Sequence, residues 1–513
     1  MLTALLALAA CTQPVTPGAA PDTAPQTESD GEKVLRVALT TFPNALYLPQ
    51  AAERNATNAS WAIYDSLVWS NDEGALEGAL ATDWEISEDG TTYTFTLREG
   101  VTFHNGEPFN ADAVVFAWEQ GQDPQNQYFD NWTPAISVEA VDDYTVVVQT
   151  EEPQPLFLRV VAQSWGMIPP AYFNEVGLEG FLQNPVGTGP FRLVEWAQGD
   201  RIVLEKNEDY WREGYPLVDQ VIFRPIPESA TRVAAIQTGE VDIVTRLSAE
   251  EAASLEGTAG INIVSYPSDR VYYVAFNNLT TGVGQPTEDP RVRIAMNHAV
   301  DVEAIIDALF GGNARPATGL VTPANWGFDD SLEPFAYDPD LAREMLAEAG
   351  YPDGFSMDFA CPAGAYTNFE QVCEAVQGYL AEVGIETDLN IMESGAFWDL
   401  EAAKELPPIF GDSWSATIGE ALQRLIGALR GWDASYSAWE DPVILDLLDR
   451  IEVEVDDDAR AALYVELQQY MMENPPFIYL YQLDVFEAHS DRVENHRPRA
   501  AEDYWLFYVD IAE

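Results

Sequence analysis

Basic residues are scarce in this chain of 513 residues, which has 25 Lys+Arg against 85 Asp+Glu and a formal net charge of −60 at pH 7. Lys occurs only at Lys33, Lys206 and Lys404. Nucleic acids and anionic membrane surfaces are bound by clustered basic side chains, so the composition argues against both as partners. Hydrophobic residues still make up 47% of the chain, which is enough for a large core and excludes a disordered acidic tail.

Long hydrophobic runs are missing too. After the first ten residues no stretch has 18 uninterrupted apolar residues, so no later segment is expected to cross a membrane. Residues 1–10 are apolar and are followed by Cys11, a pattern that predicts a lipoprotein signal peptide over 1–11 with Cys11 lipidated, although no basic residue precedes the run. A buried free Cys is the alternative. Residues 12–32 are rich in Pro, Thr, Ala and Gly and predict a flexible tether.

Cysteine is rare, and Cys361 and Cys373 are the pair that remains beyond Cys11. An isolated pair in an exported protein favours a disulfide, with two buried thiols as the alternative. Cys361 ends a strand-like run and Cys373 lies early in a helical pattern. A bridge would therefore join a strand to the helix that follows it.

Catalytic motifs are absent as well: the chain has no GxxxxGK[ST], GxSxG or HExxH pattern. The four His residues, His104, His298, His489 and His496, are dispersed in the sequence and form no Cys/His cluster. We therefore expect no enzyme activity, no cofactor and no metal site. A secreted hydrolase remains as an alternative of a different class.

The hydrophobic pattern predicts a mixed α/β chain. Strands are expected at 34–39 and 92–97, as a hairpin over 138–150, near Ser356 and Thr387, and at 504–511. Helices are expected at 291–309, 339–349 and 459–474. Alternating helices and strands after Asp289 favour α/β units with a largely parallel sheet.

A series of sequence blocks gives a more specific signal. They are LATDW (80–84), DGTTYTF (89–95), FHNGEPF (103–109), PVGTGPF (185–191), NEDYW (207–211), QTGEVD (237–242), FNN (276–278), DPRVR (289–293), YDP (337–339) and AGYP (349–352). In this order they resemble the family 5 extracellular solute-binding proteins of ABC importers. Within them Asp89-Gly90 and Asn105-Gly106 predict tight turns. Gly187 and Gly189 are expected where the backbone passes closely, and His104 as a hydrogen-bonded structural residue.

The resemblance implies a two-lobed, periplasmic-binding-protein-like α/β fold with an additional strand-rich domain. By analogy, lobe I comprises 33–64, 190–276 and 480–513, the additional domain 65–189, and lobe II 277–479. A small-molecule or short-peptide ligand would bind between the lobes and be delivered to ABC permease subunits. The protein would be extracytoplasmic, lipid-anchored at the outer face of the cell membrane or in the periplasm, and monomeric.

The resemblance also bears on the ligand. Peptide-binding relatives have an Asp three residues after a Trp, whereas here Thr417 follows Trp414, and the loop 362–368 has no Arg. Both charged anchors of the dipeptide pattern are thus missing, and WSATIGEA (414–421) is similar to the glutathione-binding branch. The candidate ligand contacts are Trp414, Ser415, Thr417 and Glu420, with Asn277, Tyr273 and Phe42 as weaker candidates from their position. Short peptides or peptide-like compounds are the predicted ligands, and oligosaccharides or nickel complexes are the alternatives. The acidic surface favours cationic or neutral ligands through long-range steering.

Overall fold

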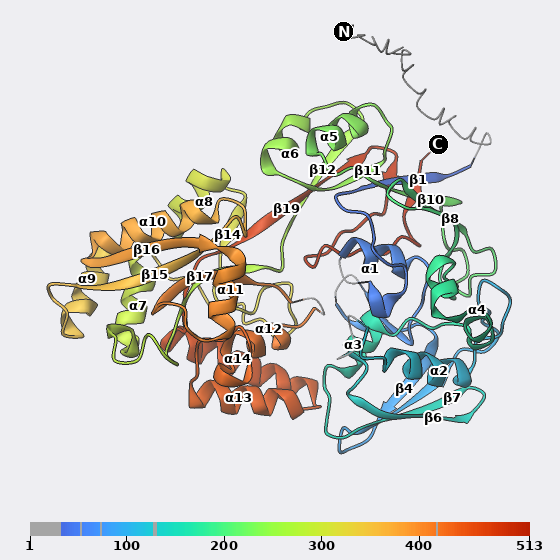
Figure 1. Cartoon of the computed structure of the whole chain (residues 1–513), viewed down its shortest axis with the longest axis horizontal. Helices are drawn as coiled ribbons and strands as arrows, with labels where there is room; N and C mark the ends of the chain where they lie inside the picture. The colour runs from blue at the N-terminus through green and yellow to red at the C-terminus, as the bar shows by residue number, and fades with distance from the viewer. Residues whose placement is uncertain (1–31, 52–53, 72–73, 127–130, 417–418, 513) are drawn as a thin grey trace, which may run out of the picture. The chain divides into compact units, whose positions relative to one another are not determined.

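The computed structural model describes residues 32–51, 54–71, 74–126, 131–416 and 419–512. The predicted signal peptide, with Cys11, and all but the last residue of the predicted tether lie outside these ranges. Residues Lys33–Glu513 form a single unit, which contains three main β-sheets (Figure 1). In the described part of the chain, no helix is both long and apolar enough to cross a membrane.

The first sheet collects strands from distant parts of the chain, in the order β12-β19-β11-β1-β10-β9-β8, with β14 paired to β19. Their bounds are Ile261–Pro267 (β12), Tyr481–Ser490 (β19), Ile243–Leu247 (β11), Val34–Leu39 (β1), Gln220–Pro225 (β10), Arg201–Lys206 (β9), Phe191–Ala197 (β8) and Ala314–Pro316 (β14). Strand β1 runs parallel to β10 and β11, as central strands do when both faces are covered. Its side chains alternate accordingly: Leu35, Val37 and Leu39 join one core cluster and Ala38 joins another.

The second sheet has the order β16-β15-β17-β13-β18. Its strands are Ile385–Glu393 (β16), Phe355–Ala363 (β15), Ile409–Trp414 (β17), Val271–Phe276 (β13) and Phe477–Tyr479 (β18). The pairs β16-β15 and β15-β17 are parallel, whereas β17-β13 and β13-β18 are antiparallel. The sheet is therefore mixed rather than largely parallel, because β13 runs antiparallel to both of its neighbours, β17 and β18.

The third sheet is antiparallel, in the order β4-β5-β7-β6: Ala81–Ile86 (β4), Thr92–Leu97 (β5), Thr145–Thr150 (β7) and Ala135–Asp142 (β6). Two short ribbons complete the strands, Val68–Ser70 (β2) with Leu76–Gly78 (β3) and Val493–Glu494 (β20) with Asp510–Ile511 (β21). The predicted turns are present, with Gly90 at φ +69° and Gly106 at φ +85°, a region in which glycine is not strained.

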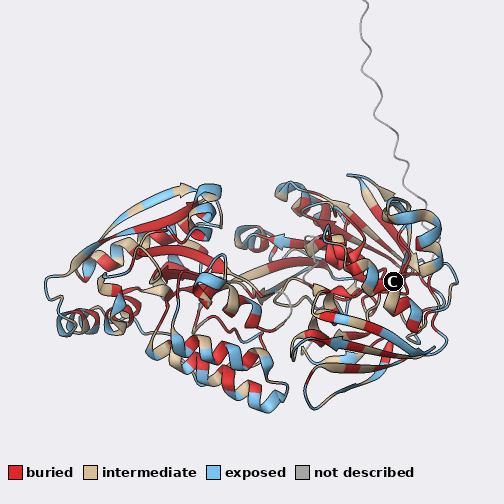
Figure 2. Cartoon of the chain, turned by 60° about the horizontal axis from the view of Figure 1, so that its bottom comes forward, coloured by how far each residue is buried: buried red, intermediate tan, exposed pale blue. Residues whose placement is uncertain are grey.

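The helices cover the sheets, and buried residues run along the strands and the inner helix faces (Figure 2). They are α1 Arg54–Trp61, α2 Ala111–Gly121, α3 Phe157–Ser164, α4 Pro170–Gln183, α5 Ser229–Gln237, α6 Ala249–Leu255, α7 Pro290–Ala299, α8 Val302–Phe310, α9 Pro339–Glu348, α10 Phe369–Glu382, α11 Ser394–Ala402, α12 Leu422–Leu429, α13 Pro442–Val453 and α14 Asp457–Glu473. Short 3₁₀ turns lie at η1 Leu48–Gln50, η3 Pro286–Glu288 and η4 Gly431–Asp433.

Two short segments connect the first and second sheets: residues 268–270 between β12 and β13, and Leu480 between β18 and β19. They lie side by side, since the Ser268 amide donates to the Leu483 carbonyl (2.8 Å) and the Leu480 amide to the Tyr272 carbonyl (3.1 Å). The chain thus passes from the first sheet to the second at residues 268–270. This is one strand, β13, earlier than the boundary between lobe I and lobe II that the sequence predicted after residue 276. The division into lobes remains a proposal.

Two secondary-structure predictions were wrong. The single helix expected over 291–309 is two helices. Helix α7 ends at Ala299, and Asp301 caps the start of α8 by accepting the Ala304 amide (2.9 Å). The strand expected at 504–511 is confined to Asp510–Ile511. The preceding aromatic residues pack into the core instead, with Trp505 stacked on Trp61 at 4.8 Å between ring centroids.

Other expectations are confirmed. Cys361 on β15 and Cys373 on α10 form a disulfide with Cα atoms 6.5 Å apart. His104 is a structural residue, since its Nε2 bonds the Gly189 carbonyl (3.0 Å) and burial lowers its pKa to about 4. The close approach at Gly189 is equally clear, because a Cβ there would lie 2.5 Å from the Ile63 carbonyl carbon.

Candidate ligand-binding site

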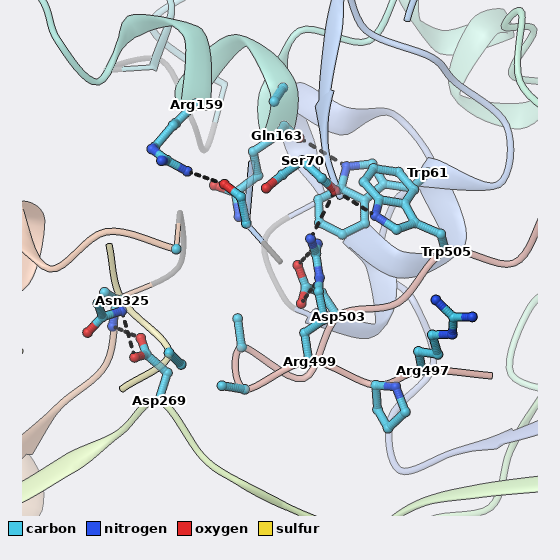
Figure 3. A pocket seen from close by; sticks show the side chains of 18 of the residues that line it. Trp61, Ser70, Arg159, Gln163, Asp269, Asn325, Arg497, Arg499, Asp503 and Trp505 are labelled. Atoms are coloured by element: carbon cyan, nitrogen blue, oxygen red, sulfur yellow. Dashed lines mark hydrogen bonds and ion pairs between the residues drawn. The ribbon is translucent and has the colours of Figure 1, made fainter. Parts of the chain in front are cut away.

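A cavity of about 410 Å³ is formed where segments far apart in the sequence converge (Figure 3). It is lined by Trp61, Ser70, Gly74, Arg159, Ala162, Gln163, Asp269, Pro323, Ala324, Asn325, Ala416, Gly419, Arg497, Pro498, Arg499, Ala500, Ala501, Asp503 and Trp505. These residues come from all three proposed parts of the chain, the two lobes and the strand-rich domain. The cavity is therefore a candidate ligand site.

The indole rings of Trp61 and Trp505 form an apolar wall of the cavity. They stack on each other, and each indole nitrogen is fixed by a backbone carbonyl: Trp61 Nε1 donates to Gln163 (3.0 Å) and Trp505 Nε1 to Ser70 (3.1 Å). Because both N–H groups are satisfied, the rings keep one orientation without a ligand. This wall offers apolar contact area at small entropic cost.

An ion pair between Arg499 and Asp503 shapes the loop beneath this wall. Arg499 Nε donates to Asp503 Oδ1 (3.0 Å), its second guanidinium nitrogen bonds Oδ2, and its Nη1 donates to the Ser70 carbonyl (3.1 Å). A guanidinium fork on a carboxylate is a geometrically specific pair. It holds the loop between β20 and β21 against the end of β2.

Asp269 organises the opposite side of the cavity, as Figure 3 shows. It lies in the crossing segment 268–270, is buried, and accepts the Ala416 amide (2.8 Å), the Thr322 hydroxyl (3.0 Å) and the Asn325 amide (3.0 Å). Arg424 pairs with it at 3.5 Å. Its carboxylate is thus engaged by the chain's own donors and ties two cavity-lining loops to the crossing segment.

Glu420 joins two parts of the chain across the cavity margin. Its side chain is fully buried; Oε1 accepts from Arg460 (2.6 Å) and Tyr464 (2.7 Å), and Oε2 lies 3.2 Å from Arg159 Nε. Arg159 belongs to α3 and also donates to the Gly74 carbonyl (2.9 Å). Burying a carboxylate demands such partners, so Glu420 is structural and does not itself line the cavity.

The cavity reverses the charge balance of the chain. Arg159, Arg497 and Arg499 line it, against Asp269 and Asp503, whereas the whole chain carries more than three acidic residues for each basic one. A guanidinium has five N–H donors, so the bonds of Arg159 to Gly74 and Glu420 do not use all of them. Arg159 therefore keeps N–H donors that a ligand could use, whereas Arg499 is largely engaged by Asp503 and the Ser70 and Asn71 carbonyls.

The predicted ligand contacts are distributed differently from what the sequence suggested. Tyr273 is buried against Phe477 at 4.5 Å, and Asn277 is buried with its amide bonded to the Leu406 carbonyl (2.9 Å). Phe42 is half-buried against the core cluster that contains Leu35, Val37 and Leu39. None of the three is a lining residue in the described part of the chain.

The run 414–421 does border the cavity, through Ala416 and Gly419. Trp414 packs at 5.7 Å from Tyr436, and the Ser415 hydroxyl accepts a long hydrogen bond from Arg270 (3.4 Å). Thr417 lies outside the described residues. The segment was located from sequence, but not the residues within it that face the cavity.

Asp412 on β17, two residues before the run 414–421, is another carboxylate near this segment, and it does not line the cavity. It is buried, accepts the Tyr366 hydroxyl (2.7 Å), and has its pKa raised by burial. The neighbouring Glu401 is buried too, and burial together with Asp412 raises its pKa to about 10. The two carboxyls therefore share a proton inside the second sheet's core and are not ligand contacts.

Sequence reasoning missed Arg159, Arg497, Arg499 and Asp503. One signal was present: the HRPR run at 496–499 places two Arg residues around a proline in a chain poor in cations. For Arg159 and Gln163 there was only the amphipathic pattern of α3, which does not show what its polar face meets.

Comparison with known proteins agrees with this fold. Residues 75–435 match the family described as bacterial extracellular solute-binding proteins, family 5, middle region. The glutathione-binding protein GsiB of Shigella dysenteriae is 33% identical over 442 residues, covering 84% of this chain and 85% of that protein.

Two solved structures extend the likeness to the whole fold. HbpA2 from Haemophilus parasuis matches with a TM-score of 0.86 and 26% identity, covering 94% of this chain and 100% of that one. The ABC transporter-associated periplasmic binding protein DppA from Helicobacter pylori, in complex with the peptide STSA, matches with a TM-score of 0.71 and 27% identity, covering 94% and 98%.

The chain belongs to the family 5 bacterial extracellular solute-binding proteins. The predicted family, the two-lobed α/β fold class and the solute-binding function are thereby confirmed. The family places the protein outside the cytoplasm.

Proposed function

We propose that this protein captures short peptides or peptide-like compounds bearing carboxylates, with glutathione as the leading candidate, and delivers them to an ABC permease. The observation that carries the proposal is the concentration of Arg159, Arg497 and Arg499 around one cavity in a chain of net charge −60. Arginine binds carboxylates through two parallel hydrogen bonds, which gives both affinity and orientation.

The size and lining of the cavity support a small ligand. Its volume of about 410 Å³ falls in the range of roughly 300–1,000 Å³ typical of small-molecule sites. Trp61 and Trp505 would contact apolar parts of the ligand, and the loop carrying Arg497 and Arg499 would hold a carboxylate. The glutathione-binding name of GsiB and the peptide in the DppA complex support the same ligand class.

Nickel and oligosaccharides are less well supported. No His is among the described residues that line the cavity, whereas imidazole is a usual protein ligand for nickel. Stacked Trp rings suit sugars, but charged guanidiniums beside them favour an anionic partner.

The binding test uses isothermal titration with glutathione, di- to hexapeptides, glutathione diethyl ester, maltotriose and nickel. Glutathione or an acidic peptide should bind with one equivalent, and the diethyl ester, which has no carboxylate, at least tenfold more weakly. Arg497→Gln should weaken binding by at least tenfold, while Arg343→Gln, a change on the exposed helix α9, should not. Equal affinity for glutathione and its ester would overturn the role assigned to the arginines.

We further propose that binding occurs without turnover, that the protein is a monomer, and that Cys11 carries a lipid anchor. Its high net charge opposes self-association. Incubation with the bound peptide should return it intact, and light scattering should give the mass of one chain. Radiolabelled palmitate should enter the native protein and not Cys11→Ala; label retained in the variant would reject the anchor.

A further inference from the structure

The sequence suggested that the histidines are dispersed, but the structure brings two of them together on one carboxylate. Nε2 of His489 lies 3.1 Å and Nε2 of His496 lies 3.0 Å from Oε2 of Glu487. The three side chains are at most 7% exposed. They lie apart from the residues that line the ligand cavity, although His496 directly precedes Arg497.

The fold explains how the cluster forms. Glu487 and His489 are two residues apart on β19, so their side chains point to the same face of the first sheet. Strand β19 is central there, between β11 and β12, and His496 arrives from the loop that follows β20. The ring centroids of the two histidines are 4.7 Å apart.

We infer that Glu487, His489 and His496 form a binding site for a divalent transition-metal ion, with Zn²⁺ as the best match. Two imidazole nitrogens and one carboxylate oxygen are a donor set that zinc uses in proteins, with water as a fourth ligand. All three ligand atoms lie within 4.8 Å of one another. Two ligands about 2.0–2.1 Å from a tetrahedral ion lie about 3.3–3.4 Å apart, so the observed 3.0 and 3.1 Å need only a small expansion.

The surroundings support the ligand roles. The Tyr266 hydroxyl donates to the other oxygen of Glu487, Oε1, at 3.0 Å and leaves Oε2 for the ion. Second-shell hydrogen bonds of this kind orient a ligating carboxylate.

The position of the site gives it a consequence. His496 begins the segment that continues into the cavity loop with Arg497, Arg499 and Asp503. An ion bound to all three ligands fixes the start of this loop to β19. A bound metal ion would therefore order the loop 497–503, which lines the ligand cavity, without contacting the ligand.

The test uses full-length protein carrying no histidine tag, stripped with a chelator and titrated with Zn²⁺ against a chromophoric competitor. The native protein should bind one equivalent, and Co²⁺ in its place should give the visible absorption of a four-coordinate site. His489→Gln and His496→Gln should each weaken Zn²⁺ binding by at least 100-fold. His298→Gln is the matched control, since His298 lies on α7 and bonds the Ala336 carbonyl.

Hydrogen exchange gives a second readout, independent of the ligand. Zn²⁺ should slow exchange over residues 497–503 in the native protein and in His298→Gln, and not in His496→Gln. Far-UV circular dichroism and thermal unfolding check that the variants are folded. Zn²⁺ binding that is equal in all four proteins, or absent from the native one, would overturn the site and identify only adventitious binding to acidic side chains.

Discussion

Arg159 on α3 and Glu420 in the loop after β17 are 261 residues apart in sequence, yet Nε of one lies 3.2 Å from Oε2 of the other. Glu420 is fully buried, while the Arg159 side chain is 11% exposed. The pair therefore connects α3, in the strand-rich segment, to the loop after β17. Glu420 is the fixed member of the pair, because Arg460 and Tyr464 also hold its carboxylate.

The two ends of this pair should differ in their effect on stability. Glu420→Gln leaves the buried Arg460 with only the exposed Asp457 as a carboxylate partner, which should lower the free energy of unfolding by about 3–5 kcal/mol. Arg159→Met leaves Glu420 paired with Arg460 and Tyr464, so the loss should be about 1 kcal/mol. Urea unfolding followed by tryptophan fluorescence measures both; equal losses would contradict the structural role of Glu420.

The buried His104 should make stability depend on pH in acid. Burial lowers its folded pKa to about 4 from the usual value of 6.5, so the unfolded chain binds the proton first as the pH falls. The folded protein should therefore lose about 2–3 kcal/mol between pH 7 and pH 4 through this residue. His104→Gln should lack that loss relative to the native protein in urea unfolding across this range, and His298→Gln should keep it.

Gly189 should not tolerate a side chain. A Cβ there would lie 2.5 Å from the Ile63 carbonyl carbon, so Gly189→Ala must displace backbone and should cost about 1–3 kcal/mol or more. Gly378 in α10 has no such neighbour within 4 Å, and Gly378→Ala should be neutral or stabilise by up to about 1 kcal/mol. Thermal unfolding of the two variants should shift in opposite directions; a shift of the same size and sign would show that the close approach is not rigid.

The disulfide between Cys361 and Cys373 closes a short loop, with a sequence separation of 12. Chain-entropy arguments give about 3 kcal/mol for a loop of this length. The double variant Cys361→Ala/Cys373→Ala should unfold at lower urea concentration by about that free energy, and reducing agent should destabilise the native protein but not the variant. An effect of reductant on the variant would assign it to something other than this bond.

Local signals in the sequence predicted local structure well. The alternation in 92–97 and the Asp89-Gly90 turn gave β5 and its turn, and the period of 339–349 gave α9, because these patterns depend on neighbours along the chain. The helix over 291–309 was wrong at Asp301, where a capping side chain competes with continuation of the helix. Residues 504–507 have strand-like composition, but the packing of Trp505 against Trp61 and Trp69 decides their conformation.

The site was harder to predict, because its residues meet only in three dimensions. The run 414–421 was identified, yet the side chains with strong ligand chemistry, Trp414 and Glu420, are used in packing and in buried ion pairs. Arg159 and Arg499 reach the cavity from elements 340 residues apart, a relationship that no local pattern encodes. The same holds for His489 and His496, which a central strand and a loop bring together on Glu487.

The strand order of the first sheet has a consequence for how the chain folds as it is made. Strand β19 pairs with both β11 and β12, and β1 pairs with β11, so residues 481–490 are needed before strands that were synthesised much earlier can complete their hydrogen bonding. The second sheet draws all its strands from the continuous stretch 271–479, and four of its five strands are made before residue 415. Long-range pairing is the slow part of folding. The facing edges of β11 and β12 therefore stay unpaired until residues 481–490 have been synthesised, more than 200 residues after these two strands.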